Sequence, residues 1–259
     1  VMGYTEEPFD GEGGYDIYIT FYSSPYVYGY NYSIGGGVSY LKIDNDYGPQ
    51  SAKSNFDLTP IQIMQLSVAH EYFHGIQWGY ELNLGNNAYF YEMTSMWFED
   101  VLIPNGNDYL EDGWIDDLLD NPTSDFDNTG NGYELALFGH YLSSFIDPYG
   151  AVDEKNSTII REIWEDYSAH CINTDNQCSD YINLDQCETS ENCDWVRGNC
   201  TINTDTCVNY YNEDSCEGDC EWIEGENLVF TSVKSTLEDK YNQSFIANWT
   251  DFISRNLFN

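Results

Sequence analysis

The residues best suited to chemistry lie together in one short segment, His70-Glu71-Tyr72-Phe73-His74. Two histidines four positions apart on a helix project from one face, so their imidazoles can converge on one metal ion, for which zinc is the usual choice. Glu71 would lie beside the metal without binding it, where its carboxylate can take a proton from the attacking water and pass it to the leaving amine. The pattern predicts metal-dependent peptide hydrolysis; its alternative is a pair of incidental histidines packed in a helical core.

A catalytic zinc site needs a third protein ligand and one open position. The metzincin arrangement takes a histidine at position 80, where this chain has Tyr80, so that arrangement is excluded. The gluzincin arrangement takes a glutamate from a following helix, and the segment 91–100 offers Glu92 and Glu99. These two lie seven positions apart and share one helix face. We expect Glu92 to bind the metal and Glu99 to orient a zinc-binding histidine, with the reverse assignment as the alternative.

The helix that must carry the histidines is predicted over about residues 60–81. Thr59 supplies an N-cap hydroxyl, Pro60 suits the first turn, and apolar residues follow on more than one face, which indicates a buried helix. Strands are expected within about residues 15–46, where aromatic and β-branched residues alternate. Further helices are predicted at 88–102, 132–146, 156–168, 228–240 and 244–256. Strands followed by helices favour an α+β domain with an antiparallel or mixed N-terminal sheet.

Three segments of this chain together resemble gluzincin metallopeptidases, in particular secreted bacterial and archaeal zinc peptidases. The segments are Ile43-Asp-Asn-Asp46, His70-Glu-Tyr-Phe-His-Gly-Ile-Gln77 and Glu92-Met-Thr-Ser-Met-Trp-Phe-Glu-Asp100. The resemblance spans about residues 8–168 and 228–259, and it implies a gluzincin-like helical domain whose zinc is bound by His70, His74 and Glu92. The chain has Met93-Thr-Ser95 where Gly-Thr-Ala is usual, which narrows the expected cleft and leaves the ligands intact.

The resemblance also implies a downstream tyrosine or histidine that stabilises the oxyanion formed during hydrolysis. Tyr133 and His140 are the candidates, because they lie seven positions apart on the helix predicted over 132–146 and therefore share a face. Packing in the core or on the surface explains both residues equally well.

The cysteines all lie within one stretch, which predicts a disulfide framework and an oxidising, extracellular compartment. They are Cys171, Cys178, Cys187, Cys193, Cys200, Cys207, Cys216 and Cys220. A four-cysteine pattern occurs twice in tandem, loosely similar to plexin-repeat modules, and the pairing within each copy stays open. We expect 171–223 to be an insertion into a metallopeptidase-like domain formed by 1–170 and 224–259. The insertion is either a disulfide-bonded surface segment without an activity of its own or a module that recognises a partner or substrate.

The chain is strongly acidic, with 8 lysines and arginines against 45 aspartates and glutamates and a net charge of −37. Such a surface repels nucleic acids and anionic membranes, which excludes both as partners, and no long apolar run predicts membrane insertion. Solubility explains the charge; divalent-cation binding is the alternative. Asp10 with Asp16, and Asp44 with Asp46, offer calcium ligands on turns, although ordinary turn chemistry explains them too.

Three functions remain open at this stage. The first is a secreted zinc endopeptidase acting on a protein or peptide substrate. The second is a non-catalytic, self-assembling surface or filament protein that reuses the fold, motivated by 23 tyrosines and by glycosylation sequons. The third is a glycan binder whose Cys-rich modules present Trp195 and Trp222. The sequons are at Asn31, Asn156, Asn199, Asn242 and Asn248.

Overall fold

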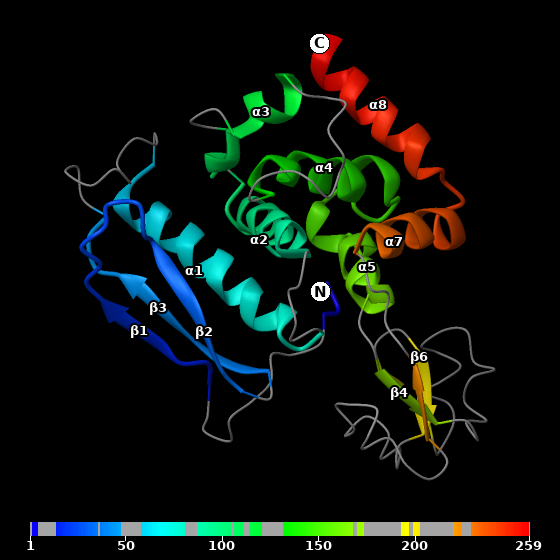
Figure 1. Ribbon diagram of the computed structural model, residues 1–259, viewed down its shortest axis with the longest axis horizontal. Coiled ribbons are helices and arrows are strands. Elements are labelled where there is room, and N and C mark those ends of the chain that lie inside the picture. The colour runs from blue at the N-terminus through cyan, green and yellow to red at the C-terminus, as the bar shows by residue number, and fades with distance from the viewer. Residues whose placement is uncertain are drawn as a thin grey trace.

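The computed structural model has a mixed α+β architecture, in which a small sheet lies on one side of a helical body (Figure 1). The expected α+β class is thereby confirmed. The structure describes residues 2–4, 14–35, 37–47, 58–80, 87–104, 106–110, 114–120, 132–167, 170–173, 193–196, 199–202, 220–223 and 229–258. None of the helices within these ranges combines the length and the apolar character that a membrane crossing requires.

Three strands form the sheet, in the order β1-β3-β2. They are β1 (Ile17–Thr20), β2 (Gly29–Gly35) and β3 (Val38–Asp44), all within the predicted span. β2 and β3 pair antiparallel and β1 runs parallel to β3, so the sheet is mixed. Alternate residues of β3, including Leu41 and Ile43, are buried, whereas the residues between them are more exposed. This alternation is typical of a strand with one covered face.

Helix α1 (Pro60–Gln77) covers the sheet and carries both histidines of the motif. Thr59 caps its N-terminus and a proline occupies the first turn, as the sequence predicts. The Gln62 side chain completes a capping box with Thr59. The helix ends at Gln77 rather than near residue 81. The backbone N–H groups of Gly79 and Tyr80 donate to carbonyls only three residues back, which tightens and closes the last turn.

Helix α2 (Ala88–Leu102) lies against α1 on the side away from the sheet, and its bounds match the predicted span (Figure 1). Most of its side chains are buried, and Phe90, Met93 and Trp97 enter the main core. Because α2 is covered nearly all round, Glu99 is buried and Glu92 and Asp100 are half-buried. This burial makes α2 the central element of the fold.

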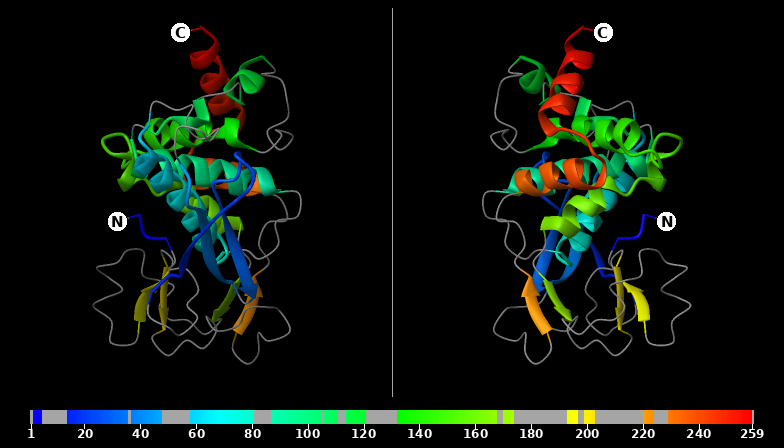
Figure 2. Two further views of the ribbon diagram at one scale, coloured as in Figure 1. Left: turned by 90° about the vertical axis from the view of Figure 1, so that its left-hand side faces the viewer. Right: turned by 90° about the vertical axis from the view of Figure 1, so that its right-hand side faces the viewer.

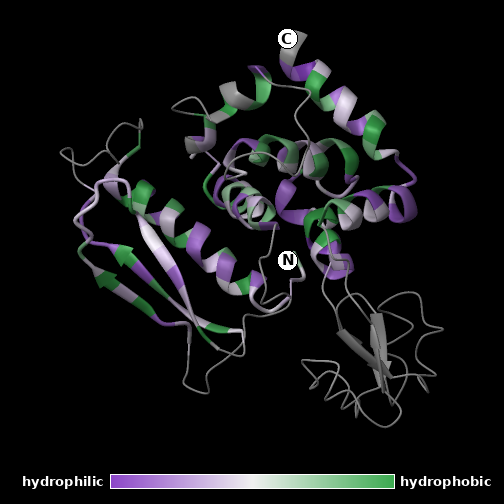
Figure 3. Ribbon diagram, in the orientation of Figure 1, coloured by the Kyte–Doolittle hydropathy of each residue, from purple (hydrophilic) through white to green (hydrophobic). Residues whose placement is uncertain are grey.

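Shorter helices complete the body around α2. They are η3 (Asp108–Leu110), α3 (Trp114–Asp120), η4 (Tyr133–Leu135), α4 (Ala136–Tyr141), η5 (Leu142–Ile146), η6 (Glu154–Asn156), α5 (Ile159–Tyr167), α7 (Val229–Ser235), η10 (Thr236–Lys240) and α8 (Phe245–Phe258). The predicted helix 132–146 is a succession of 3-10, α and π turns, and α7 continues into a π turn. Figure 3 shows hydrophobic colouring along α4, inside this body. Figures 1 and 2 agree that α7 lies beside α5, although the Cys-rich segment separates them in the sequence.

Gly132 decides how the chain enters η4. Its backbone is left-handed, with φ +87°, and a side chain at this position would collide with the carbonyl oxygen of Tyr89. Only glycine combines this conformation with such a close approach. The contact brings the following residue, Tyr133, against the first turns of α2.

Four short strands are described in the Cys-rich segment. They are β4 (His170–Asn173), β5 (Cys193–Val196), β6 (Asn199–Ile202) and β7 (Cys220–Ile223). β4 pairs with β7 so that Cys171 is opposite Trp222, and β5 pairs with β6 so that Trp195 is opposite Cys200. The two copies of the cysteine pattern therefore make equivalent strand pairs, each joining the start of one copy to the end of the other. The remaining cysteines and the predicted disulfide pairing lie outside the described residues.

Candidate metal centre

Three side chains from α1 and α2 point their ligand atoms at one position. His70 Nε2 lies 3.1 Å from His74 Nε2 and 3.0 Å from Glu92 Oε2. His74 Nε2 lies 3.7 Å from the same carboxylate oxygen. All three residues are half-buried, and theirs is the only group of histidine, cysteine, aspartate and glutamate side chains in the described ranges that is close enough to hold an ion. The two histidines and Glu92 thus lie together, as the sequence predicts.

Glu99 holds His70 from behind. Its Oε1 lies 2.5 Å from His70 Nδ1, and only 3% of Glu99 is exposed. The Glu99 carboxylate accepts a hydrogen bond from Nδ1–H of His70, and this fixes the ring so that Nε2 faces the other two ligand atoms. The seven-residue spacing of Glu92 and Glu99 therefore places one beside His70 Nε2 and the other at His70 Nδ1.

Electrostatics favour positive charge at this position. Burial raises the pKa of Glu92, but hydrogen bonds and charge interactions with the two histidines outweigh that effect and hold its pKa well below the ordinary value. Burial lowers the pKa of His70, but hydrogen bonds to Glu92 and Glu99 outweigh it, so the pKa of His70 lies well above its usual range. Two carboxylates flanking one imidazole thus stabilise a cationic group here.

Glu71 lies on α1 beneath the edge strand β2. Asn31 of β2 donates from Nδ2 to the carbonyl oxygen of Glu71, 2.9 Å away. A Cβ at Gly29 would come within 3.0 Å of Glu71 Cγ, so β2 packs closely on this side chain. Burial raises the pKa of Tyr47 to about 12, and the negative charge of Glu71 adds to the rise. The general-base candidate is therefore next to the ligands on α1 and covered by β2.

Tyr133 reaches the same site from η4. Its ring centre lies 6.2 Å from that of His70. Burial raises the pKa of Tyr133 far above its ordinary value, and the charges of Glu92, Glu71 and Glu99 raise it further. The phenol therefore keeps its proton and can act as a hydrogen-bond donor. The structure places this predicted residue beside the group formed by His70, His74 and Glu92.

His140 lies elsewhere. Its Nδ1 is 3.0 Å from Glu154 Oε2 and its Nε2 is 3.4 Å from Asp100 Oδ2, and its ring stacks on Tyr109. Seven helical residues carry the chain about 10 Å along the axis, so sharing a face with Tyr133 does not bring His140 to the same site. His140 instead links α2, α4 and η6.

Within the described ranges, Asp16, Asp44 and Asp46 do not belong to any group of three or more side chains close enough to hold an ion. Asp44 is buried and accepts from the backbone N–H of Asn45, which is turn chemistry, and from that of Tyr22, 22 positions away in the sequence. Asp16 and Asp46 are exposed, and Asp16 accepts from the Tyr18 hydroxyl. Asp10 lies outside the described residues.

One residue at the centre was not predicted. Gln77 is fully buried, and its Oε1 lies 2.7 Å from His74 Nδ1. Its position, three residues after His74 on the same helix, could have indicated this contact.

Comparisons with protein-family models, with curated proteins and with solved structures found no match to this chain. The chemistry of the site is therefore argued from its own geometry.

Proposed function

We propose that this chain is a secreted zinc-dependent peptidase whose metal is held by His70, His74 and Glu92. The observation that carries the proposal is the spacing of the three ligand atoms. A tetrahedral zinc ion with metal–ligand distances of about 2.05 Å holds its ligand atoms about 3.3 Å apart. The distances of 3.1, 3.0 and 3.7 Å bracket that value. Two imidazole nitrogens and one carboxylate oxygen are also a donor set typical of catalytic zinc.

Zinc, when bound, supplies a Lewis acid that polarises the peptide carbonyl and makes water a better nucleophile at neutral pH. The protein supplies the rest. Glu71 takes the proton from the attacking water and delivers it to the leaving amine. Tyr133 donates its phenol hydrogen to the developing oxyanion. Glu99 keeps His70 in the tautomer that the site requires.

The strand β2 offers a place for an extended peptide. It is the last strand of the described sheet on the side of Glu71, and Asn31 ties it to the backbone of that residue. A peptide that adds to a strand edge forms main-chain hydrogen bonds along it. Such a peptide would run past Glu71, which supports a peptide bond as the group attacked.

The test is metal content combined with a Glu71→Gln variant. The purified wild-type protein should contain about one zinc per chain and cleave peptides from a broad library. Glu71→Gln should keep the zinc and lose cleavage, because the amide cannot accept the proton. Glu238→Gln, at an exposed position, is the matched control and should behave as the wild type. A zinc-loaded wild-type protein that cleaves nothing would contradict the peptidase proposal.

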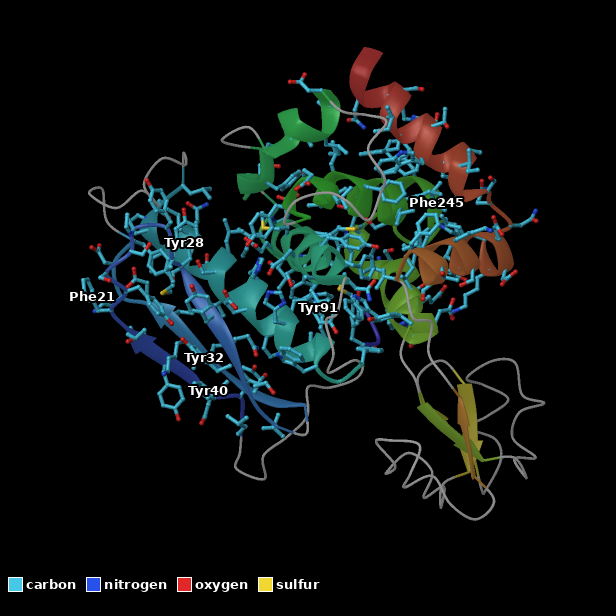
Figure 4. All side chains as sticks on the ribbon, in the orientation of Figure 1. Phe21, Tyr28, Tyr32, Tyr40, Tyr91 and Phe245 are labelled. Atoms are coloured by element: carbon cyan, nitrogen blue, oxygen red, sulfur yellow. The ribbon has the colours of Figure 1, made fainter. Side chains whose placement is uncertain are left out.

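A self-assembling role is the second candidate, because strand β1 is exposed on both faces. Ile17, Tyr18 and Ile19 are 47%, 51% and 66% exposed, and Phe21 projects from the far side of the sheet (Figure 4). An exposed apolar edge strand favours pairing with another chain. Electron microscopy of native material should show filaments or a lattice if this role holds, and dispersed particles if it does not.

A further inference from the structure

Gln77 is the last residue of α1 and is fully buried, so each polar atom of its amide must find a partner. Its Nε2 lies 2.9 Å from the carbonyl oxygen of Tyr91, 2.9 Å from Thr94 Oγ1 and 3.2 Å from Ser95 Oγ. Its Oε1 lies 2.7 Å from His74 Nδ1. One amide therefore joins a metal-binding histidine to the first half of α2.

The orientation of this amide follows from its neighbours. The carbonyl oxygen of Tyr91 can only accept, and Thr94 donates its own hydroxyl proton to the carbonyl oxygen of Phe90, 2.8 Å away. Both partners therefore require the NH₂ group of Gln77, which turns its oxygen towards His74. A carbonyl oxygen accepts, so His74 must carry its proton on Nδ1. Its Nε2 then faces His70 Nε2, 3.1 Å away, and Glu92 Oε2, 3.7 Å away.

We propose that Gln77 is a positioning residue for the metal centre: it holds His74 as the Nδ1-protonated tautomer and fixes the ring relative to Glu92. Gln77 is also connected to Glu92 through the backbone of α2. It donates to the carbonyl oxygen of Tyr91, and Tyr91 directly precedes Glu92. The inference rests on the proposed metal centre. It extends that centre by one neutral residue that neither binds metal nor touches substrate.

A glutamine suits this position and a glutamate does not. A carboxylate would place an oxygen 2.9 Å from the carbonyl oxygen of Tyr91, where two acceptors repel. It would also add a further negative charge to a site that already contains Glu71, Glu92 and Glu99. Ser95 completes the arrangement, since its Oγ lies 3.2 Å from His74 Nδ1 as well as from Gln77. Ser95, which stands where the resembling peptidases usually have alanine, thus makes a polar contact with both His74 and Gln77.

The first test needs no variant. In metal-free wild-type protein at about pH 8, nitrogen NMR should show a proton on Nδ1 of His74, because the carbonyl oxygen of Gln77 can only accept. A His74 ring that carries its proton on Nε2 and none on Nδ1 would overturn the inference, whatever the metal content of the protein. This readout is independent of catalysis, so it separates the role of Gln77 from the proposed peptidase function.

The second test compares Gln77→Glu and Gln77→Met with Gln65→Glu, an exposed control on the same helix. Zinc affinity, measured by chelator competition, should fall about 10–100-fold in both Gln77 variants and stay unchanged in the control. The visible spectrum of the cobalt-substituted protein should change only in the Gln77 variants. If the wild-type protein binds zinc and the folded Gln77 variants bind it equally well, Gln77 has no positioning role. If the wild-type protein binds no zinc, the proposed metal centre itself is wrong.

Discussion

At the metal centre, the two histidines of α1 are held by side chains of different charge. The Glu99 carboxylate accepts from His70, and the neutral amide of Gln77 accepts from His74. A carboxylate partner makes an imidazole a stronger ligand than an amide partner does. The Glu99 charge helps to raise the pKa of His70, whereas Gln77 adds no negative charge to the site.

Replacing Glu99 by glutamine tests the contribution of that charge. Glu99→Gln keeps the shape of the side chain but removes the negative charge behind His70, so zinc affinity should fall about 10–100-fold. The pKa of His70 should fall as well, because the Glu99 charge helps to raise it. Chelator competition and a proton NMR titration measure the two effects. Equal zinc affinity in Glu99→Gln and wild-type protein would show that Glu99 is only a packing residue.

Tyr133 is predicted to act on the reaction rather than on the metal. Tyr133→Phe removes the hydroxyl that we propose donates to the oxyanion, so kcat should fall about 100-fold while zinc content and KM change little. Tyr149→Phe, at an exposed position, is the matched control. Steady-state kinetics on one peptide substrate makes the comparison. A rise in KM with unchanged kcat would instead place Tyr133 in substrate binding.

Among the elements, α2 connects the metal centre to the rest of the helical body. Glu92 and Glu99 face α1, and the next residue, Asp100, faces His140 of α4. Asn31 connects β2 to α1 through Glu71 and Trp78, so its amide is already committed although it lies in a sequon. Asn156 and Asn242, two further sequon residues, are exposed. The packing of α2 and β2 against their neighbours therefore decides which polar side chains connect one element to another.

His140 is expected to stabilise this packing without taking part in catalysis. His140→Gln removes the imidazole between Asp100 and Glu154, leaving two half-buried carboxylates near each other, and should reduce the free energy of unfolding by about 1–3 kcal/mol. Zinc content and kcat should be unchanged at a temperature where the variant is folded. Chemical denaturation and kinetics measure both. If His140→Gln leaves the free energy of unfolding unchanged but reduces kcat 100-fold, His140 stabilises the oxyanion after all.

Helix α5 carries a carboxyl group that makes stability depend on pH. Burial raises the pKa of Glu165 to about 7, against the opposing charge of Arg161. Because the folded pKa lies above the unfolded value, the folded protein binds more protons between about pH 4.5 and 7, and stability falls as pH rises through this window. Glu165→Gln should remove that part of the slope. Thermal unfolding at several pH values tests this, and an unchanged slope in the variant would contradict it.

Across the whole molecule, the net charge of −37 is the dominant long-range property. A field of this sign attracts cationic peptides and repels acidic ones, and salt weakens both effects. Peptides rich in lysine or arginine should therefore be cleaved with a kcat/KM that falls about 10-fold between low and high salt. An uncharged peptide with the same scissile bond is the control. An equal salt response for both peptides would mean that the charge does not steer substrate.

The elements and the ligand set were predictable because their signals are local. The N-cap at Thr59, the apolar pattern of 88–102 and the alternation along β3 each involve neighbours in the chain. Each element formed at the expected place, although α1 ends about four residues early, at Gln77. The spacing of His70 and His74 and the seven-residue step from Glu92 to Glu99 are likewise properties of single helices. Local patterns were therefore enough to name His70, His74, Glu92 and Glu99 as candidates, although not to show that zinc binds there or that Gln77 lies beside His74.

Only the tertiary structure decided which of those residues meet. Tyr133 reaches the centre because Gly132 packs on the backbone of α2. His140, on the same predicted face, lies about two helical turns further on and pairs with Asp100 and Glu154. Gln77 acquires its role because α2 buries it and supplies three acceptors for one amide. Sequence patterns specify which way a side chain points from its own helix; the packing of one helix on another specifies what it touches.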